Sequence, residues 1–386
     1  MTVVRHFALA AGGTGGHMVP AHALAAELMR RGHRVALVTD ERGARIPGLF
    51  DGVQTHIIPA GRLGGGPRAW LKAWRDIRAG TAMARTLYET FDPAAVIGFG
   101  GYPALPALRA GFRARIPTLV HEQNAVLGRV NRLVAGKVDA IATAYPQVQR
   151  LKPKYEEKTF LVGNPVRDIV RDIRDQPFPE IGPDSIFRVL VTGGSQGASI
   201  LSDVVPDGLA LLPQGFRRRL QVTQQCRPED IEAVRSKYKV LGIPADLATY
   251  FTDLPERLAW AHLVIARAGA STIADISVAG RPAILIPLPS AADDHQTANA
   301  RELAAVGGAR SIRQENFTPQ ELAKQMQKLA LDPKALINAA KRAYGVGRPN
   351  AAEDLADLVE RIGLAPLMDP IPVQKLELRP LKGAFA

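Results

Sequence analysis

The same local pattern occurs twice in this chain: a short apolar strand, a glycine-rich turn and a helix. The first copy places the strand at 7–11, followed by Gly-Gly-Thr-Gly-Gly-His, and the second places it at 187–192, followed by Gly-Gly-Ser-Gln-Gly-Ala-Ser. Glycine turns between a strand and a helix are typical of βαβ units that bind nucleotides or phosphate. The repeat therefore predicts an α/β fold of two Rossmann-like domains that face each other across a cleft. One such turn is weaker evidence for a ligand, because it can also serve only to pack a helix on a strand.

A charged stretch that contains proline separates the two copies and is typical of a connection between domains. We expect an N-terminal domain over 1–163 and a C-terminal domain over 164–349. A last helix at 350–363 is expected to pack back on the N-terminal domain. The proline-bearing tail 364–386 is predicted to be loose.

The segment 266–300 predicts a strand end, a turn, a short helix, a second turn and a second strand. Gly269, Ser271 and Thr272 stand where the first turn becomes the helix, so that free backbone N–H groups and the helix dipole favour an anion. Asp275, further along this helix, offers the carboxylate with which α/β folds bind the hydroxyl pair of a ribose. After the second strand comes a close-set group of side chains suited to sugar hydroxyls: Asp293, Asp294, His295, Gln296 and Asn299. Phosphate, ribose and sugar sites together indicate a nucleotide sugar.

The formal net charge of +12 over 386 residues calls for an anionic partner. Nucleic acid, an anionic membrane surface and a phosphorylated ligand all satisfy that demand. Aromatic residues make up only 6% of the chain, and the arginines are spread along it, which disfavours the stacking platforms of nucleic-acid binding. The lone Cys226 fits a reducing cytosol, and we expect neither a signal peptide nor a membrane-spanning helix.

The segment 61–85 alternates apolar and basic residues at helical spacing. The apolar members are Trp70, Leu71, Trp74 and Ile77, and the basic ones are Arg68, Lys72, Arg75 and Arg78. A helix of this kind can lie on anionic lipid headgroups. Alternatively, the apolar stripe faces the core and the arginines flank it in solvent.

Polar residues directly follow two further apolar strands, at 94–101 and 118–122. Because the carboxyl ends of parallel strands form the ligand crevice, His121 and Glu122 are site candidates. The alternative is a buried, hydrogen-bonded pair that shapes the loop, and we favour it over direct chemistry.

Seven motifs in a fixed order extend these local arguments: GGTGGH, GFGGYP, HEQN, GNPVR, GGSQGA, RAGASTIADI and DHQTANA. Together they resemble the undecaprenyldiphospho-muramoylpentapeptide β-N-acetylglucosaminyltransferases of bacterial peptidoglycan synthesis, from the first strand to the last helix. The resemblance implies the GT-B fold and an inverting transfer of GlcNAc from UDP-GlcNAc to the C4 hydroxyl of MurNAc in lipid I, which gives lipid II and UDP. It also implies a peripheral location on the cytoplasmic face of the inner membrane, with other cell-wall synthesis proteins as candidate partners.

The resemblance also assigns individual roles. Residues that would bind the substrates are Thr14, Gly15, Gly16, Asn124, Arg167, Ser195, Thr252, Gly269, Ala270, Ser271, Thr272, Asp275 and Gln296. The segment Phe251–Thr252 would meet uracil through its backbone. Two positions depart from the usual pattern: Asp275 replaces a Glu, and His295 replaces the first member of a Gln-Gln pair.

His17 would lie beside the reacting sugar, and we propose it as the general base for the acceptor hydroxyl, with Glu122 in reserve. Alternatively, His17 only caps the glycine turn or hydrogen-bonds the sugar. Metal-dependent transferases usually hold their ion with Asp-x-Asp, and this triplet is absent from the chain. We therefore expect no metal and no other cofactor, and we expect a helix N-terminus, Arg167 and Ser195 to stabilise the departing UDP.

Two other functions fit the same residues less well. A UDP-GlcNAc 2-epimerase-like enzyme also uses two Rossmann-like domains, but it needs no lipid-facing helix. A non-catalytic sensor or scaffold that binds a nucleotide sugar belongs to a different class and differs in forming no product.

Overall fold

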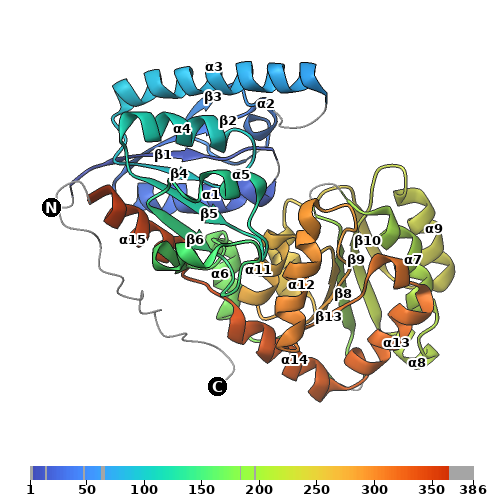
Figure 1. Ribbon diagram of the computed structural model, residues 1–386. Coiled ribbons are helices and arrows are strands. Elements are labelled where there is room, and N and C mark those ends of the chain that lie inside the picture. The colour runs from blue at the N-terminus through green and yellow to red at the C-terminus, as the bar shows by residue number, and fades with distance from the viewer. Residues whose placement is uncertain are drawn as a thin grey trace. The chain divides into compact units, whose positions relative to one another are not determined.

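The computed structural model describes residues 3–13, 15–46, 48–61, 66–182, 184–194 and 197–364. They form two compact units (Figure 1). The first unit contains the described residues up to Arg167 together with the closing segment from Asn350, and the second unit is Asp168–Pro349. The division therefore falls after Arg167, whereas the sequence pattern placed it after 163. The predicted loose tail lies, from 365 on, outside the described residues.

The first unit is built on a seven-stranded parallel sheet in the order β3-β2-β1-β4-β5-β6-β7. The strands are β1 (His6–Ala10), β2 (Arg34–Thr39), β3 (Gln54–Ile57), β4 (Ala95–Gly98), β5 (Thr118–Glu122), β6 (Ala140–Thr143) and β7 (Thr159–Leu161). The helices are α1 (Gly15–Arg30), α2 (Glu41–Ala44), α3 (Pro67–Phe91), α4 (Ala104–Ala114), α5 (Arg129–Val134) and α15 (Ala351–Leu364), with a 3₁₀ turn at Pro153–Lys158.

Both faces of this sheet are covered, which explains why its central strands are apolar throughout. Phe7 and Leu9 of β1 pack with α1 and α15 on one face. Ala8 and Ala10 pack on the other face, with residues of α3, α4 and α5. The helix α15 closes the first face, and Arg31, directly after α1, holds it by ion pairs to Asp357 and Glu360 at 2.6 and 2.8 Å.

The second unit repeats the design with a six-stranded parallel sheet in the order β10-β9-β8-β11-β12-β13. Its strands are β8 (Phe187–Thr192), β9 (Leu220–Gln225), β10 (Ala245–Ala248), β11 (Leu263–Ala266), β12 (Ala283–Leu285) and β13 (Ala309–Ser311). Its helices are α6 (Asp168–Arg174), α7 (Ser199–Ala210), α8 (Gln214–Arg217), α9 (Ile231–Leu241), α10 (Leu254–Trp260), α11 (Ala270–Val278), α12 (His295–Ala305), α13 (Pro319–Ala330) and α14 (Pro333–Val346), with 3₁₀ turns at Ala292–Asp294 and Gln314–Asn316.

Each sheet has its first strand in the interior, next to the fourth strand of its unit. The chain leaves these two neighbours in opposite directions, and open α/β sheets bind ligands outside the carboxyl ends of the strands at such a switch point. In the first unit the turns after β1 and β4 lie there, and in the second unit the turns after β8 and β11. All four turns carry glycine.

The predicted strands and helices that open each unit are confirmed, but two regions differ. From the sequence we also expect a strand at 248–251, but the observed strand, β10, is Ala245–Ala248. Phe251 lies in the loop after β10, and its apolar ring is buried there. The guanidinium carbon of Arg257 lies 4.1 Å from the ring centroid. The polar segment from His295 was predicted only as a cluster of side chains, and it forms the helix α12.

The packing of α15 yields a stability prediction. Leu355 is fully buried in the first unit, so Leu355→Ala should lower the free energy of unfolding by about 2–5 kcal/mol through lost burial and a cavity. Leu364→Ala, on the same helix at 47% exposure, is the matched control and should cost less than about 1 kcal/mol. Urea unfolding followed by circular dichroism would measure both, and equal losses would show that α15 is not anchored as described.

Candidate functional site

The helix α11 begins directly after the turn that follows β11, and the backbone N–H groups of its first turn are open to a ligand. Gly269 is its N-cap residue, with φ −65° and ψ 145°, and no side chain caps the helix. Among the described residues, the backbone N–H groups of 270–272 have no acceptor. The hydroxyl of Ser271 is buried there without a partner. Free N–H groups at the positive end of a helix dipole form a binding site for an anion such as a diphosphate.

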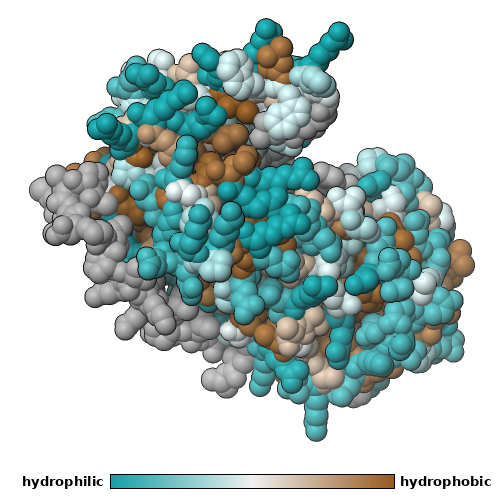
Figure 2. Space-filling model, in the orientation of Figure 1, coloured by the Kyte–Doolittle hydropathy of each residue, from teal (hydrophilic) through white to brown (hydrophobic). Residues whose placement is uncertain are grey.

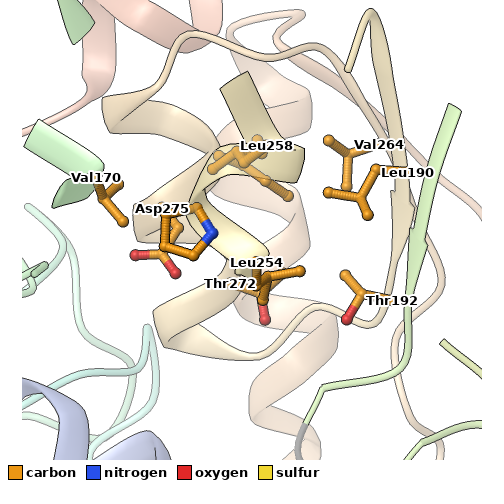
Figure 3. A pocket seen from close by; sticks show the side chains of 10 residues that line it. Val170, Leu190, Thr192, Leu254, Leu258, Val264, Thr272 and Asp275 are labelled. Carbon is orange, nitrogen blue, oxygen red and sulfur yellow. The ribbon is translucent and has the colours of Figure 1, made fainter. Parts of the chain in front are cut away.

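Asp275 lies one turn further along α11, beside a small cavity. The cavity measures about 30 Å³ and is lined by Val170, Leu190, Thr192, Leu254, Pro255, Leu258, Val264, Thr272, Asp275 and Ile276. Figure 3 shows that the oxygens of Thr192, Thr272 and Asp275 point away from Leu190, Leu258 and Val264. A volume of this size holds about one water. The cavity is thus a gap behind α11 and does not accommodate a nucleotide.

Two side chains of α12 hold the turn before α11. The Gln296 side-chain oxygen accepts hydrogen bonds from the backbone N–H groups of Ala268 (3.1 Å) and Leu288 (3.0 Å). Asn299 is fully buried and donates to the Ala268 carbonyl at 3.3 Å. Of the polar group predicted to bind sugar hydroxyls, Asn299 is therefore a structural residue. Gln296 has only its amide N–H groups available for a ligand.

Three residues that shape the second unit's loops were not singled out from the sequence. Gln225 accepts from the Thr192 hydroxyl at 2.9 Å and donates to the carbonyls of Gly194 and Thr249 at 3.0 and 3.2 Å. Arg267 is buried and donates to the Ile286 and Pro287 carbonyls and to the Gln314 side chain. The third, Arg257, covers Phe251. Gln225 and Arg267 could have been found because each is a polar or charged residue at the end of an apolar strand, whereas Arg257 lies within α10.

In the first unit, the glycine turns after β1 and β4 lie against each other. A Cβ on Gly12 would come within 2.5 Å of Pro103, and one on Gly101 within 2.7 Å of the Gly12 carbonyl oxygen. The His17 ring lies between the turns: its Nδ1 is 3.2 Å from the Gly12 carbonyl oxygen, and a Cβ on Gly100 would be 3.1 Å from its Nε2. Glycine is required at these positions because a side chain would displace the neighbouring turn or the imidazole.

Glu122, at the end of β5, is buried and serves as a hydrogen-bond acceptor for the loop that follows. Its two oxygens accept from the backbone N–H groups of Asn124 (3.0 Å) and Gly128 (2.7 Å) and from the side chains of Asn124 (3.2 Å) and Asn131 (2.9 Å). Burial raises the pKa of Glu122, and these donors oppose that effect. The contacts favour the interpretation that Glu122 shapes the loop and positions Asn124, with no direct part in chemistry.

His121 is fully buried and neutral. Burial lowers its pKa to about 4, although a hydrogen bond to the Gly163 carbonyl opposes this. Nε2 lies 2.8 Å from that carbonyl oxygen, and Nδ1 lies 3.0 Å from the Gln123 amide nitrogen. The two partners assign the proton to Nε2 and the acceptor role to Nδ1. His121 thus links the ends of β5 and β7.

The predicted site residues fall into two groups, one in each unit. The first unit holds Gly15, Gly16, His17, Glu122, Asn124 and Arg167, and the second holds Thr252, Gly269, Ala270, Ser271, Thr272, Asp275 and Gln296. Arg167 is half-buried, and its Nε is a buried donor with no partner among the described residues. Thr14 and Ser195 lie outside the described residues. Among the described residues, no three His, Cys, Asp or Glu side chains are grouped to hold a metal ion.

The chain matches both domain models of one glycosyltransferase family and a solved structure of similar fold. The model of the glycosyltransferase family 28 N-terminal domain matches residues 7–143, and that of the family's C-terminal domain matches 188–361. A crystal structure of Acinetobacter baumannii MurG superposes with a TM-score of 0.72 at 28% identity, covering 92% of this chain and 99% of that one. The α/β fold of two Rossmann-like domains, of GT-B type, is thereby confirmed.

Two curated relatives are similar over nearly the whole chain. The protein from Zymomonas mobilis is 68% identical over 93% of each chain, and that from Novosphingobium aromaticivorans is 65% identical over 96% of this chain and 95% of its own. Both are named UDP-N-acetylglucosamine–N-acetylmuramyl-(pentapeptide) pyrophosphoryl-undecaprenol N-acetylglucosamine transferase. This chain belongs to glycosyltransferase family 28.

The neutral His121 predicts how stability depends on pH. A histidine with a pKa near 6.5 when unfolded and about 4 when folded binds more protons in the unfolded state between these values. The contribution of His121 to the free energy of unfolding is therefore complete above pH 6.5. It falls by about 3 kcal/mol in total as the pH is lowered towards 4.

Unfolding free energies of the wild type and of His121→Gln between pH 4 and 7 test this. The wild type should lose more stability over that range than the variant, because Gln does not titrate. Parallel curves would contradict a buried neutral imidazole.

Proposed function

We propose that this protein transfers GlcNAc from UDP-GlcNAc to the C4 hydroxyl of MurNAc in lipid I, with inversion, to give lipid II and UDP. The observation that carries the proposal is the open N-terminus of α11 with Asp275 one turn along the same helix. That arrangement offers donors for a diphosphate and a carboxylate for a ribose on one element. The resemblance in sequence supplies the identity of the sugar and of the acceptor.

The second unit is the proposed donor domain. The N–H groups of 270–272 bind the diphosphate and stabilise the charge that UDP gains as the anomeric bond breaks. Arg167, which ends the N-terminal part of the first unit, is assigned to the donor nucleotide by the sequence resemblance, and its buried Nε has no protein acceptor among the described residues. The Asp275 carboxylate accepts from the ribose, the backbone of Phe251–Thr252 meets uracil, and the Gln296 amide donates to a GlcNAc hydroxyl.

The first unit is the proposed acceptor domain, and His17 is the proposed base. Its Nδ1–H donates to the Gly12 carbonyl, which leaves the lone pair on Nε2. As the C4 oxygen of the acceptor forms its bond to the anomeric carbon and the bond to UDP breaks, Nε2 takes the hydroxyl proton. Glu122 is less suited to this step, because four N–H groups already occupy its oxygens.

Asp275→Ala should raise the KM for UDP-GlcNAc by about 10- to 100-fold with little change in kcat, since a hydrogen bond to the ribose is made in ground and transition states alike. Asp275→Glu, which restores the residue usual in the family, should keep KM within a few-fold. Steady-state kinetics measure both variants, and a fall in kcat alone would exclude the ribose role.

His17→Ala should lower kcat by about 100-fold or more while the Kd for UDP stays within a few-fold. His22→Ala is the matched control, because His22 is on the same helix and packs edge-on against Phe50. Single-turnover kinetics and UDP titration would separate the two effects. If His17→Ala kept most of its kcat, the proton would have to go to another group.

The reaction itself is tested with UDP-GlcNAc and a lipid I analogue, with EDTA present in one arm. The proposal expects free UDP and a β-linked disaccharide in both arms. Release of UDP with N-acetylmannosamine and no disaccharide would indicate the epimerase alternative, and binding without any product would indicate a sensor or scaffold.

We further propose that α3 places the protein on an anionic membrane, at the cytoplasmic face of the inner membrane where the lipid acceptor is made. Trp70, Leu71 and Trp74 are each 52% exposed, whereas Ile77, about one turn after Trp74, is buried in the core. The Arg78 guanidinium carbon lies 4.7 Å from the Trp74 ring centroid, so a cation accompanies the exposed ring. Figure 2 shows brown and pale surface among teal in the region where Figure 1 places α3. No helix among the described residues is long and apolar enough to cross a membrane.

Trp74→Ala should weaken binding to phosphatidylglycerol vesicles several-fold, because Trp74 supplies apolar area to the interface, and raised salt should weaken it further. Met83→Ala is the control: Met83 is also half exposed on α3, but helical geometry puts it on the opposite side from Trp74. Co-sedimentation measures the effect. Equal binding of both variants at all salt concentrations would exclude this face of α3.

A further inference from the structure

The sheet of the second unit ends in an edge strand, β13, that is exposed at Arg310 and Ser311, whereas Ala309 is buried. Among the described strands, β13 pairs only with β12, with Ile284 aligned to Arg310. The Gly308 carbonyl and the Ile312 N–H bond towards β12, at Ala283 and Leu285. Because backbone groups alternate sides along a strand, those of Ala309 and Ser311 face outward. They have no hydrogen-bond partner among the described residues.

A hollow of about 390 Å³ lies along this edge. It is lined by Ala304 at the end of α12, by Ala309, Arg310 and Ser311 of β13, and by Gln325 and Lys328 of α13. No carboxylate is in this lining. The exposed Ser311 offers an added strand its backbone N–H and carbonyl as partners, and the hollow offers space for side chains.

The charged residues that line the hollow favour an acidic ligand. Arg310 and Lys328 are exposed and form no ion pair or hydrogen bond in the described part of the chain, although Lys328 adds to Gln325 and Lys324 in lowering the pKa of the nearby Glu321 carboxyl. By contrast, Lys324, one turn earlier on α13, pairs with Glu321 at 3.3 Å, and Gln325 is held by the same carboxylate at 2.6 Å. A second copy of this edge would bring the same cations together, which repels. An acidic strand would instead neutralise them.

We propose that β13 and this hollow form a docking site for an extended, acidic segment of a partner protein, which adds to the sheet as a further strand. Its backbone pairs with Ser311, and its carboxylates pair with Arg310 and Lys328. The site is independent of the transfer reaction, since none of these residues belongs to the donor or acceptor groups described above.

Amide NMR spectra of the ¹⁵N-labelled full chain test the proposal with a capped peptide that alternates Glu and Val. We expect saturable shifts at Ala309 and Ser311 and slowed hydrogen exchange of the Ser311 amide. Arg310→Glu with Lys328→Glu should weaken peptide binding about tenfold or more, whereas Lys324→Glu, the matched control, should change it by less than about threefold. Transferase activity should be unchanged in the double variant.

Three results would overturn the proposal. One is the absence of shifts at 309–311 at millimolar peptide. Another is equal binding of a peptide N-methylated at alternate residues, because such a peptide keeps its charge but cannot pair as a strand. The third is saturation of the same amides by inorganic pyrophosphate but not by the peptide, which would identify a site for small anions.

Discussion

A helix leaves the N–H groups of its first turn without intrahelical acceptors, and in α11 no described part of the chain takes them up. The rest of the second unit fixes that open turn in place. Gln296 and Asn299 hold its approach through Ala268. At the other end of α11, Arg174 donates to the Val278 carbonyl and Arg281 to that of Ala279.

Both of those guanidinium groups are buried, and neither has a carboxylate partner among the described residues. Burial lowers the pKa of Arg281 to about 10, so it stays protonated at neutral pH. Cations at the C-terminal end of a helix complement its dipole. The buried cations at the C-terminal end therefore stabilise α11, and an anion bound at its N-terminal end would act in the same sense.

The elements that define the fold could be predicted because each rests on local chemistry. The apolar runs of β1, β8 and β11 are buried on both faces, and the glycine turns are needed where turns touch, as Gly12 and Gly101 show. The functions of single polar residues were harder to predict. Asn299 has the residue type of a site, but its partner is the Ala268 carbonyl, which is distant in sequence and which no local pattern reveals. Gln225 and Arg267 were missed for the same reason.

For α3 too, the sequence pattern alone could not tell which apolar residues are buried. Trp70, Trp74 and Ile77 recur at helical spacing in the sequence. This spacing fits a lipid-facing surface and a core-facing stripe equally well. The fold separates them, because Ile77 packs against the sheet's helical layer while both tryptophans remain exposed. Which apolar residues of a helix are buried depends on how its neighbours pack, and α4, a close neighbour of α3, was not predicted.

The central claim is that the nucleotide of the donor is held by the turn between β11 and α11. The most direct measurement is titration of the ¹⁵N-labelled protein with UDP, with amide shifts followed residue by residue. The account predicts that the largest shifts occur at 269–272 and around Thr252, and that they require about tenfold more UDP in Asp275→Ala. Shifts confined to the turns after β1 and β4, with none at 269–272, would contradict it.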